Sequence, residues 1–287
     1  MKEEFNLKKL IILDIDGTLR DFAYGVPNSA IKAVNMCRER GHIVCICTGR
    51  SQGTIPKDVM DMNIEAIISG GGCYIKYRNN IIKDEYIDVD ILKKFYETFK
   101  LKNNNIAFAF ESIEKVFMNN SAYEIFMDMN REKIAFLNDK QKEHFFKNEK
   151  IVYEDNIRDF NIEKDNIHKI CIWSDYKMNK KLDFFIKENN IYKSQSGMWH
   201  ENFYNEIIKK GSNKGDAIKT LCKYLKIDLK DTIAFGDGYN DIDMFNVCET
   251  SIAMEGSPLA LSNISTGMCE SVMEDGIYNE LSRRNII

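Results

Sequence analysis

Residues 9–19 read KLIILDIDGTL, an apolar run that ends at the two carboxylates Asp14 and Asp16. A near-continuous apolar run is typical of a strand that a parallel sheet buries on both faces. Burying one unpaired charge is costly, and a second carboxylate nearby adds repulsion. The segment therefore predicts a buried strand whose end needs a compensating positive charge.

The first and last thirds of the chain alternate apolar runs with amphipathic stretches. The apolar runs predict strands, and apolar residues at helical spacing predict helices between them. This alternation indicates a parallel α/β sheet of the Rossmann-like kind, with right-handed crossovers. The predicted strands are residues 9–14, 42–48, 66–69, 231–237 and 251–254, and the predicted helices are residues 28–40 and 213–227.

The middle of the chain, from about Asp84 to Lys209, has a different pattern. A helix is predicted over residues 88–100, and short strand-like runs rich in aromatic residues follow in hairpin-like pairs. An α/β rhythm that stops and then resumes indicates one domain inserted into another. We therefore expect a discontinuous core, residues 1–83 and 210–287, and an inserted α+β domain, residues 84–209.

The composition limits the possible partners and location. The 287 residues are 44% hydrophobic and 29% charged, and the net charge is −4. Because acidic and basic residues are mixed, we expect no nucleic-acid partner. No apolar run reaches membrane-spanning length and no signal-peptide segment stands out, so we expect no membrane association. The eight cysteines include no CxxC pair, which predicts reduced cysteines in a cytoplasmic protein. We expect a monomer or a weak homodimer.

Polar residues follow three of the predicted core strands. The carboxyl ends of parallel strands share one edge of a sheet, so these residues are expected to converge. Four carboxylates in one place require a cation, and oxygen ligands favour Mg²⁺ or another hard divalent ion. Lys214, at a predicted helix start, offers a second positive charge. The converging residues are Asp14 and Asp16 after the first strand, Thr48, Gly49 and Arg50 after the second, and Asp237, Asn240 and Asp241 after residues 231–237.

Each of these motifs carries little information alone. A lone DxD is usually a turn or a cap, and threonine and glycine mark many strand ends. An EF-hand does not fit GDGYND, because Tyr239 and Ile242 stand where a ligand and a glycine are required. At strand ends and in this order, the motifs together are far more specific.

Together the motifs resemble those of the haloacid dehalogenase (HAD) superfamily, in particular its phosphatase branch. They read DIDGTL at residues 14–19, TGR at 48–50, KG at 214–215 and GDGYND at 236–241. The place of the insertion resembles the C2-type cap of the Cof-type (subfamily IIB) sugar-phosphatase-like hydrolases. The segments AIISGGGCYI, SIAMEGSPLAL and MEDGIYNEL are also similar to parts of that family.

The resemblance implies a Mg²⁺-dependent phosphatase that acts on a small phosphorylated metabolite, such as a sugar phosphate, through an aspartyl-phosphate intermediate. Asp14 would attack phosphorus, and Asp16 would protonate the leaving oxygen and then activate water. Thr48, the Gly49 amide and Lys214 would hold the phosphoryl oxygens as charge builds up on them.

The resemblance also implies the metal ligands and the substrate ligands. Mg²⁺ would be held by the Asp14 carboxylate, the Asp16 main-chain carbonyl and Asp237, with support from Asp241 and Asn240. The residues expected to bind substrate are Gly49, Arg50 and Asn240. For Arg50, a solvated salt bridge is an equal alternative.

Two segments depart from the family pattern, and several functions stay open. Gly71 stands where the family often has asparagine, and residues 253–257 read AMEGS where Gly-Asn-Ala commonly follows the methionine. These departures concern substrate contacts rather than the chemistry. FMN and pyridoxal phosphate are alternative substrates. A phosphomutase of the same superfamily and a non-catalytic phosphometabolite-binding protein are alternative functions.

Overall fold

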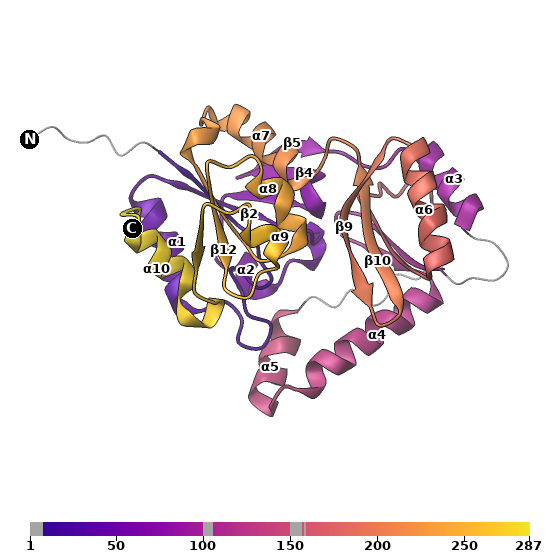
Figure 1. The fold of residues 1–287 in the computed structure, drawn as a ribbon, viewed down its shortest axis with the longest axis horizontal. Helices are drawn as coiled ribbons and strands as arrows, with labels where there is room; N and C mark the ends of the chain where they lie inside the picture. Colours follow the sequence, from indigo (N-terminus) through magenta and orange to yellow (C-terminus); the bar gives the residue numbers. More distant parts are fainter. Residues whose placement is uncertain (1–7, 100–105, 150–156, 158) are drawn as a thin grey trace, which may run out of the picture.

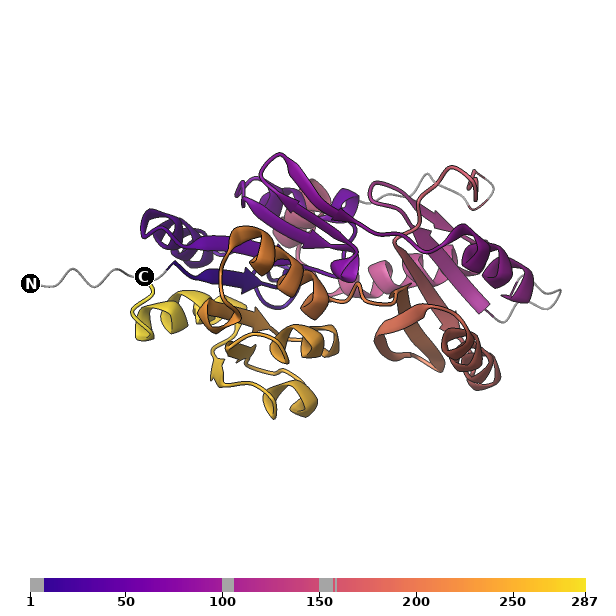
Figure 2. The ribbon, with the colours of Figure 1, turned by 90° about the horizontal axis from the view of Figure 1, so that it is seen from above.

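The computed structural model describes residues 8–99, 106–149, 157 and 159–287. These residues form two sheets, which lie side by side along the long axis of the molecule (Figure 1 and Figure 2). The larger sheet has eight strands in the order β13 (Gly267–Cys269), β12 (Thr250–Met254), β11 (Thr232–Gly236), β1 (Leu10–Leu13), β2 (Ile43–Cys47), β3 (Ala66–Ser69), β4 (Tyr74–Tyr77) and β5 (Asn80–Asp84).

Helices cover both faces of this larger sheet. One face carries α1 (Asn28–Glu39) and α10 (Gly276–Arg283), and the other carries α7 (Lys214–Leu225) and α8 (Ile242–Phe245). Within β1, Leu10 and Ile12 pack in the cluster of α7, whereas Ile11 and Leu13 pack in that of α1. All four side chains are fully buried, which confirms the strand predicted from the apolar run.

The predicted parallel sheet is confirmed for the five predicted strands, and three further strands extend it. Strands β13 to β3 pair in parallel, whereas β4 pairs antiparallel with both β3 and β5. The β4–β5 hairpin and the short β13 were not predicted. Their pattern is weak because β5 is mostly exposed and β13 has only three residues.

The smaller sheet is antiparallel throughout. Its order is β7 (Val116–Met118), β6 (Ile106–Glu111), β8 (Lys169–Ser174), β10 (Asn202–Lys209) and β9 (Ile191–Trp199). The helices α3 (Val89–Phe99) and α6 (Tyr176–Glu188) cover one face. On the other face lies α4 (Asn120–Ala135), and α5 (Asp139–Asn148) then leads back toward the larger sheet (Figure 1).

Short elements occupy the loops. They are the helices α2 (Lys57–Met60) and α9 (Leu259–Ser262), and the 3₁₀ turns η1 (Gln52–Thr54), η2 (Gly70–Gly72), η3 (Leu229–Asp231), η4 (Tyr239–Asp241) and η5 (Val272–Glu274). The turn η2 follows β3 directly and reverses the chain into β4. Both Gly70 and Gly71 have positive φ there, a conformation that glycine adopts without strain.

The chain crosses from one sheet to the other after β5 and returns after β10. Strand β5 ends at Asp84, and β10 ends at Lys209. We therefore keep the division into a core (residues 1–83 and 210–287) and a cap (residues 84–209) as a proposal. In the part of the chain that the structure describes, no helix is long and apolar enough to span a membrane.

Candidate active site

Three strand ends meet at one edge of the larger sheet. Strands β11, β1 and β2 are neighbours, so their carboxyl ends lie side by side. Asp14 follows β1, Thr48 follows β2, and Asp237 follows β11. The sheet order thus brings together the residues that three separate motifs predicted.

Lys214 places a buried ammonium group among these carboxylates. Its position is set by α7, which begins at Lys214 and is capped by the Asn213 side chain. The Nζ atom lies 2.7 Å from Asp14 Oδ1 and 2.6 Å from Asp241 Oδ1. Burial lowers the pKa of Lys214, but the two carboxylates outweigh burial and hold the pKa well above its usual range. Lys214 is therefore a permanent cation of the site.

The loop after β11 is held in shape by its own side chains. Asp241 Oδ2 accepts hydrogen bonds from the main-chain amides of Asp237 and Gly238, at 2.9 and 3.0 Å. The Thr18 hydroxyl donates to Asp237 Oδ1 at 2.9 Å. Carboxylate oxygens of Asp14, Asp237 and Asp241 lie within 4.8 Å of one another, among the residues that the structure describes.

This acidic group fits a hard divalent cation. Burial raises the pKa of Asp14 well above its usual range, and repulsion from Asp241 and Asp237 adds to burial while Lys214 opposes it. Burial and the nearby Asp241 likewise raise the pKa of Asp237 to about 6. Ionised carboxylates are therefore disfavoured here without further positive charge. Oxygen donors in this arrangement suit Mg²⁺.

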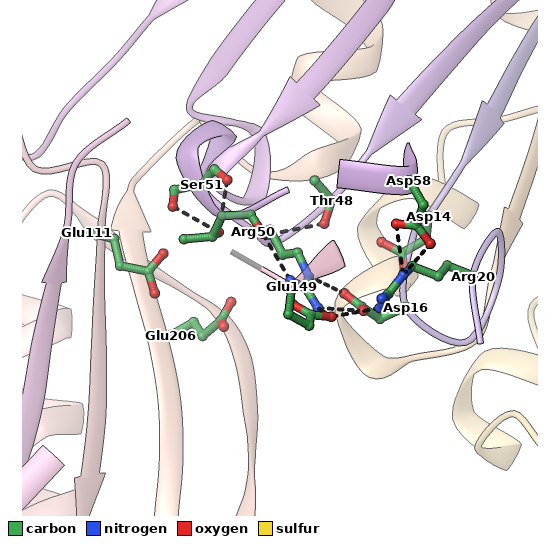
Figure 3. A network of polar contacts seen from close by, with 12 residues as sticks. Asp14, Asp16, Arg20, Thr48, Arg50, Ser51, Asp58, Glu111, Glu149 and Glu206 are labelled. Carbon is green, nitrogen blue, oxygen red and sulfur yellow. Dashed lines mark hydrogen bonds and ion pairs between the residues drawn. The ribbon is translucent and has the colours of Figure 1, made fainter. Parts of the chain in front are cut away.

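Arg50 pairs with Asp16 instead of standing free over the cavity. Its Nε and Nη2 atoms donate to the two Asp16 carboxylate oxygens at 2.6 and 2.8 Å (Figure 3). Partial burial would raise the pKa of Asp16, but the guanidinium outweighs burial and lowers it. Nη1 of Arg50 lies 2.9 Å from Glu149 Oε2, and Nη1 of Arg20 lies 2.7 Å from Glu149 Oε1. The structure thus shows the salt-bridge alternative for Arg50.

A cavity of about 730 Å³ opens in front of these groups, between the two sheets. The predicted residues Asp14, Asp16, Thr48, Gly49, Arg50, Asp237 and Asn240 all line it. Lys214 and Asp241 are buried behind Asp14, and Lys214 also lines a smaller adjoining pocket with Asn240. All nine predicted site residues therefore lie at this one place.

The wall opposite Asp14 is made by residues that the sequence did not single out. Polar groups on this wall are Glu111, Lys133, Glu149, Lys169, Tyr204 and Glu206, and apolar groups around the cavity are Phe22, Val116, Met118, Phe126 and Phe145. In the smaller sheet Glu111 is paired with Lys169, and Glu206 is paired with the residue two positions after Lys169. The three side chains therefore point to the same face of the sheet, which is the face that α3 and α6 do not cover. Glu111 is the last residue of β6 and Lys169 the first residue of β8, and a charged residue at a strand end gives no distinctive signal in the sequence.

Comparison with known proteins decides the family. A model of the haloacid dehalogenase-like hydrolases matches residues 11–281. The chain belongs to this family. The resemblance predicted from the motifs is confirmed, as are the α/β fold and the class of enzyme, a phosphatase of the HAD superfamily.

Relatives of this HAD hydrolase cover nearly its whole length. The 5-amino-6-(5-phospho-D-ribitylamino)uracil phosphatase YwtE of Bacillus subtilis is 25% identical over 277 residues, which is 94% of this chain and 95% of YwtE. YkrA of the same organism, which is named as a phosphatase, is 25% identical over 269 residues, which is 94% of this chain and 95% of YkrA.

Solved structures share the fold. A HAD phosphatase from Bacteroides thetaiotaomicron superimposes with a TM-score of 0.78 at 20% identity, over 100% of this chain and 98% of that one. A sugar phosphatase of HAD subclass IIB superimposes with a TM-score of 0.73 at 21% identity, over 98% of this chain and 100% of that one. At this identity the likeness shows a common architecture.

The variant Gly17→Ala is predicted to impair the candidate metal site. Gly17 has a φ of +82°, and an added Cβ would come within 2.3 Å of Asp237 Oδ2. The carboxylate must then move, so we expect Mg²⁺ binding, measured by calorimetry, to weaken about 10- to 100-fold. Gly41→Ala is the matched control, because Gly41 also has a φ of +82° but nothing within 4 Å of the added Cβ. Equal losses of Mg²⁺ binding in both variants would contradict the steric explanation.

The stabilisation by Mg²⁺ is predicted to depend on pH. The pKa of Asp237 is about 6 in the folded metal-free protein, against 3.8 for an ordinary aspartate. The folded state therefore holds more protons than the unfolded state in this window, and the metal-free protein loses stability as pH rises through it. We expect the difference in melting temperature between samples with Mg²⁺ and with EDTA to grow as pH rises from about 4 through 6, because binding of the cation displaces the Asp237 proton in this window. A difference that stays constant across this range would refute the assignment.

Proposed function

We propose that this HAD hydrolase is a Mg²⁺-dependent phosphatase of a small phosphorylated metabolite, similar to a sugar phosphate, and that it acts through an aspartyl-phosphate on Asp14. The observation that carries the proposal is the buried ammonium of Lys214, which lies between the carboxylates of Asp14 and Asp241. A lysine in this place opposes protonation of Asp14, to which a bound cation would add, and it offers positive charge to a phosphoryl group.

The proposed chemistry uses the two carboxylates of the DIDGTL motif in turn. Asp14 attacks phosphorus through a carboxylate oxygen, and the bond from phosphorus to the alcohol oxygen breaks. Asp16 gives its proton to the departing oxygen, because an alkoxide is a poor leaving group. Asp16 then takes a proton from a water that attacks phosphorus, which releases inorganic phosphate and restores Asp14.

The other predicted residues are proposed to bind and orient. The Thr48 hydroxyl, the Gly49 amide and Lys214 hold the phosphoryl oxygens, and Asn240 lies beside Gly49 at the cavity. Mg²⁺, held by Asp14, Asp237 and Asp241 with the Asp16 carbonyl, would supply the positive charge that these carboxylates lack.

Asp16 must first be released from Arg50. A carboxylate whose two oxygens both accept from a guanidinium is stabilised in its charged form and has no proton to give. We therefore propose that Arg50 gives up at least one of these bonds when substrate enters. Arg50 would then be free to contact the substrate, which is one of the two alternatives that the sequence left open.

The cavity supports a small, hydroxyl-rich substrate. Its volume of about 730 Å³ suits a small molecule that places both its phosphate and its leaving group inside the cavity. The carboxylates of Glu111 and Glu206 on the cap side are acceptors for hydroxyl groups. The aromatic side chains around the cavity leave room for a ring, so FMN and pyridoxal phosphate belong among the tested compounds.

The proposal includes the expected location and assembly. All eight cysteines lie in the described part of the chain, where they are buried and form no disulfide, which supports a reducing compartment such as the cytoplasm. Burial raises the pKa of Cys37 to about 12, so this thiol is unreactive at neutral pH. A monomer or a weak homodimer remains the prediction for assembly.

Asp14→Asn is predicted to abolish Mg²⁺-dependent hydrolysis of para-nitrophenyl phosphate, measured as release of nitrophenolate. An amide cannot attack phosphorus, so we expect a loss of at least about 10⁴-fold, of the size seen when a catalytic nucleophile is removed. Asp228→Asn is the control, because the Asp228 side chain is 74% exposed and lies outside the site. Retained turnover by a folded Asp14→Asn variant would disprove the role of Asp14.

A panel of phosphorylated metabolites tests the class of substrate. We expect release of free phosphate from one or more hexose or pentose phosphates, with a higher kcat/KM than for para-nitrophenyl phosphate. Movement of phosphate between two positions of a sugar, without net release, would instead identify a phosphomutase. Tight binding of a phosphorylated compound by the Mg²⁺-loaded protein without turnover would identify a binding protein.

A further inference from the structure

Lys169 connects the cap sheet to the loop that follows β2. It is the first residue of β8, and its side chain is almost fully buried. Its Nζ atom lies 2.9 Å from the main-chain carbonyl oxygen of Gly49 and 3.0 Å from Glu206 Oε1. Glu111 Oε2 lies 3.4 Å away. A cap lysine thus donates directly to the main chain of the TGR motif.

The hydrogen bond from Lys169 is coupled to a second hydrogen bond, on the Thr48 hydroxyl, through the peptide between Gly49 and Arg50. The Gly49 carbonyl and the Arg50 amide belong to the same peptide unit, and the amide donates to Thr48 Oγ1 at 3.1 Å. A cation on the carbonyl polarises this peptide and strengthens the second hydrogen bond. Because Oγ1 already accepts from the amide, the hydroxyl keeps its own hydrogen to donate elsewhere. The neighbouring cavity is where a phosphoryl oxygen would accept it.

A second cap residue holds the next residue of the same loop. Glu149 follows α5, and its Oε2 and Oε1 atoms lie 2.9 and 3.3 Å from the Arg50 guanidinium. The Glu149 side chain is only 9% exposed, and Oε1 also accepts from Arg20 (Figure 3). The aromatic ring of Phe145, on α5, packs against that of Phe22 in the core, and the two ring centroids are 5.1 Å apart. The end of α5 is therefore docked at the mouth of the site.

The charges that hold the loop stay fixed over the working range of pH. Burial would lower the pKa of Lys169, but the acidic groups around it raise the pKa well above its usual range. Burial also acts against Arg50, whose pKa is nevertheless raised by Asp16 and Glu149. Both cations therefore remain protonated at neutral pH.

We propose that Lys169 and Glu149 are positioning residues that grip the Thr48–Arg50 loop at two adjacent residues. The loop then has the geometry to receive a phosphoryl group only while the cap is docked on the core. Neither side chain reacts with substrate. This inference rests on the proposed function, because it assigns the loop to phosphoryl binding.

The test compares loss of phosphate binding with loss of stability. Lys169→Met removes the ammonium at nearly constant length, and Glu149→Gln removes the charge at constant shape. The controls are Lys177→Met on α6 and Glu143→Gln on α5, at exposed positions. Inhibition by inorganic phosphate and turnover of para-nitrophenyl phosphate are measured with Mg²⁺ present, alongside melting temperature.

We expect each positioning variant to weaken inhibition by phosphate about tenfold and to lower kcat/KM about 100-fold, because a small misplacement of a binding group is costly. The controls should stay within twofold of the wild type. Lys169→Arg, which keeps a cation, should recover part of the loss. Because both residues act on one loop, the double variant should lose less than the product of the two single losses.

Lys169→Met removes the cation that faces the carboxylates of Glu111 and Glu206, so the variant could fail to fold. The double variant Lys169→Met/Glu206→Gln also neutralises one of those carboxylates, so we expect it to lose less stability and to provide a second test. A fall in melting temperature with unchanged phosphate inhibition and unchanged kcat/KM would overturn the proposal, because it would show a purely structural role.

The outcome also separates this inference from the proposed function. If the wild type releases phosphate from no phosphomonoester, the proposed phosphatase function fails, and calorimetric binding of inorganic phosphate to wild type and variants decides the inference. Equal phosphate affinity in all proteins, or none in any, would overturn it. If the wild type is active and the positioning variants match it, the inference alone fails.

Discussion

The ion pair of Lys214 with Asp14 and Asp241 is the interaction on which the site depends. It requires β1 and β11 to be neighbours and α7 to begin at that edge of the sheet. When all three are ionised, Asp14, Asp237 and Asp241 carry three negative charges against the one positive charge of Lys214, which leaves two negative charges. A buried excess of this size is costly, and a divalent cation balances it. The lysine and the metal are therefore complementary parts of one charge balance.

The sequence predicted the core because its signals are local. The apolar run of β1 and the helical spacing of α1 are each readable within a short window, and the parallel direction of the strands follows from the alternation. The carboxylates of the site stand directly after strands, so placing the strands also placed Asp14, Thr48 and Asp237. The β4–β5 hairpin was missed because a short, mostly exposed strand has no clear apolar pattern.

The cap side of the site could not be predicted, because its contacts join distant residues. Lys169 is 120 positions from Gly49, and Glu149 is 99 positions from Arg50. A lysine at a strand end or a glutamate after a polar helix is ordinary in sequence, and which face it reaches depends on how the cap docks. The charge of Lys169 also becomes informative only when its burial between Glu111 and Glu206 is seen.

The two ion pairs of Arg50 suggest how Asp16 can be released while the contact between Arg50 and Glu149 of the cap is kept. Arg50 has two carboxylate partners of very different exposure, since the Asp16 side chain is 49% exposed and that of Glu149 is 9% exposed. Breaking an exposed ion pair costs little free energy, whereas a buried carboxylate that loses its partner is left as an unpaired buried charge. Arg50 also donates to the Thr54 carbonyl at 3.0 Å. Exchange at the Asp16 end therefore costs least, and it leaves Arg50 anchored to the cap while Asp16 becomes available for proton transfer.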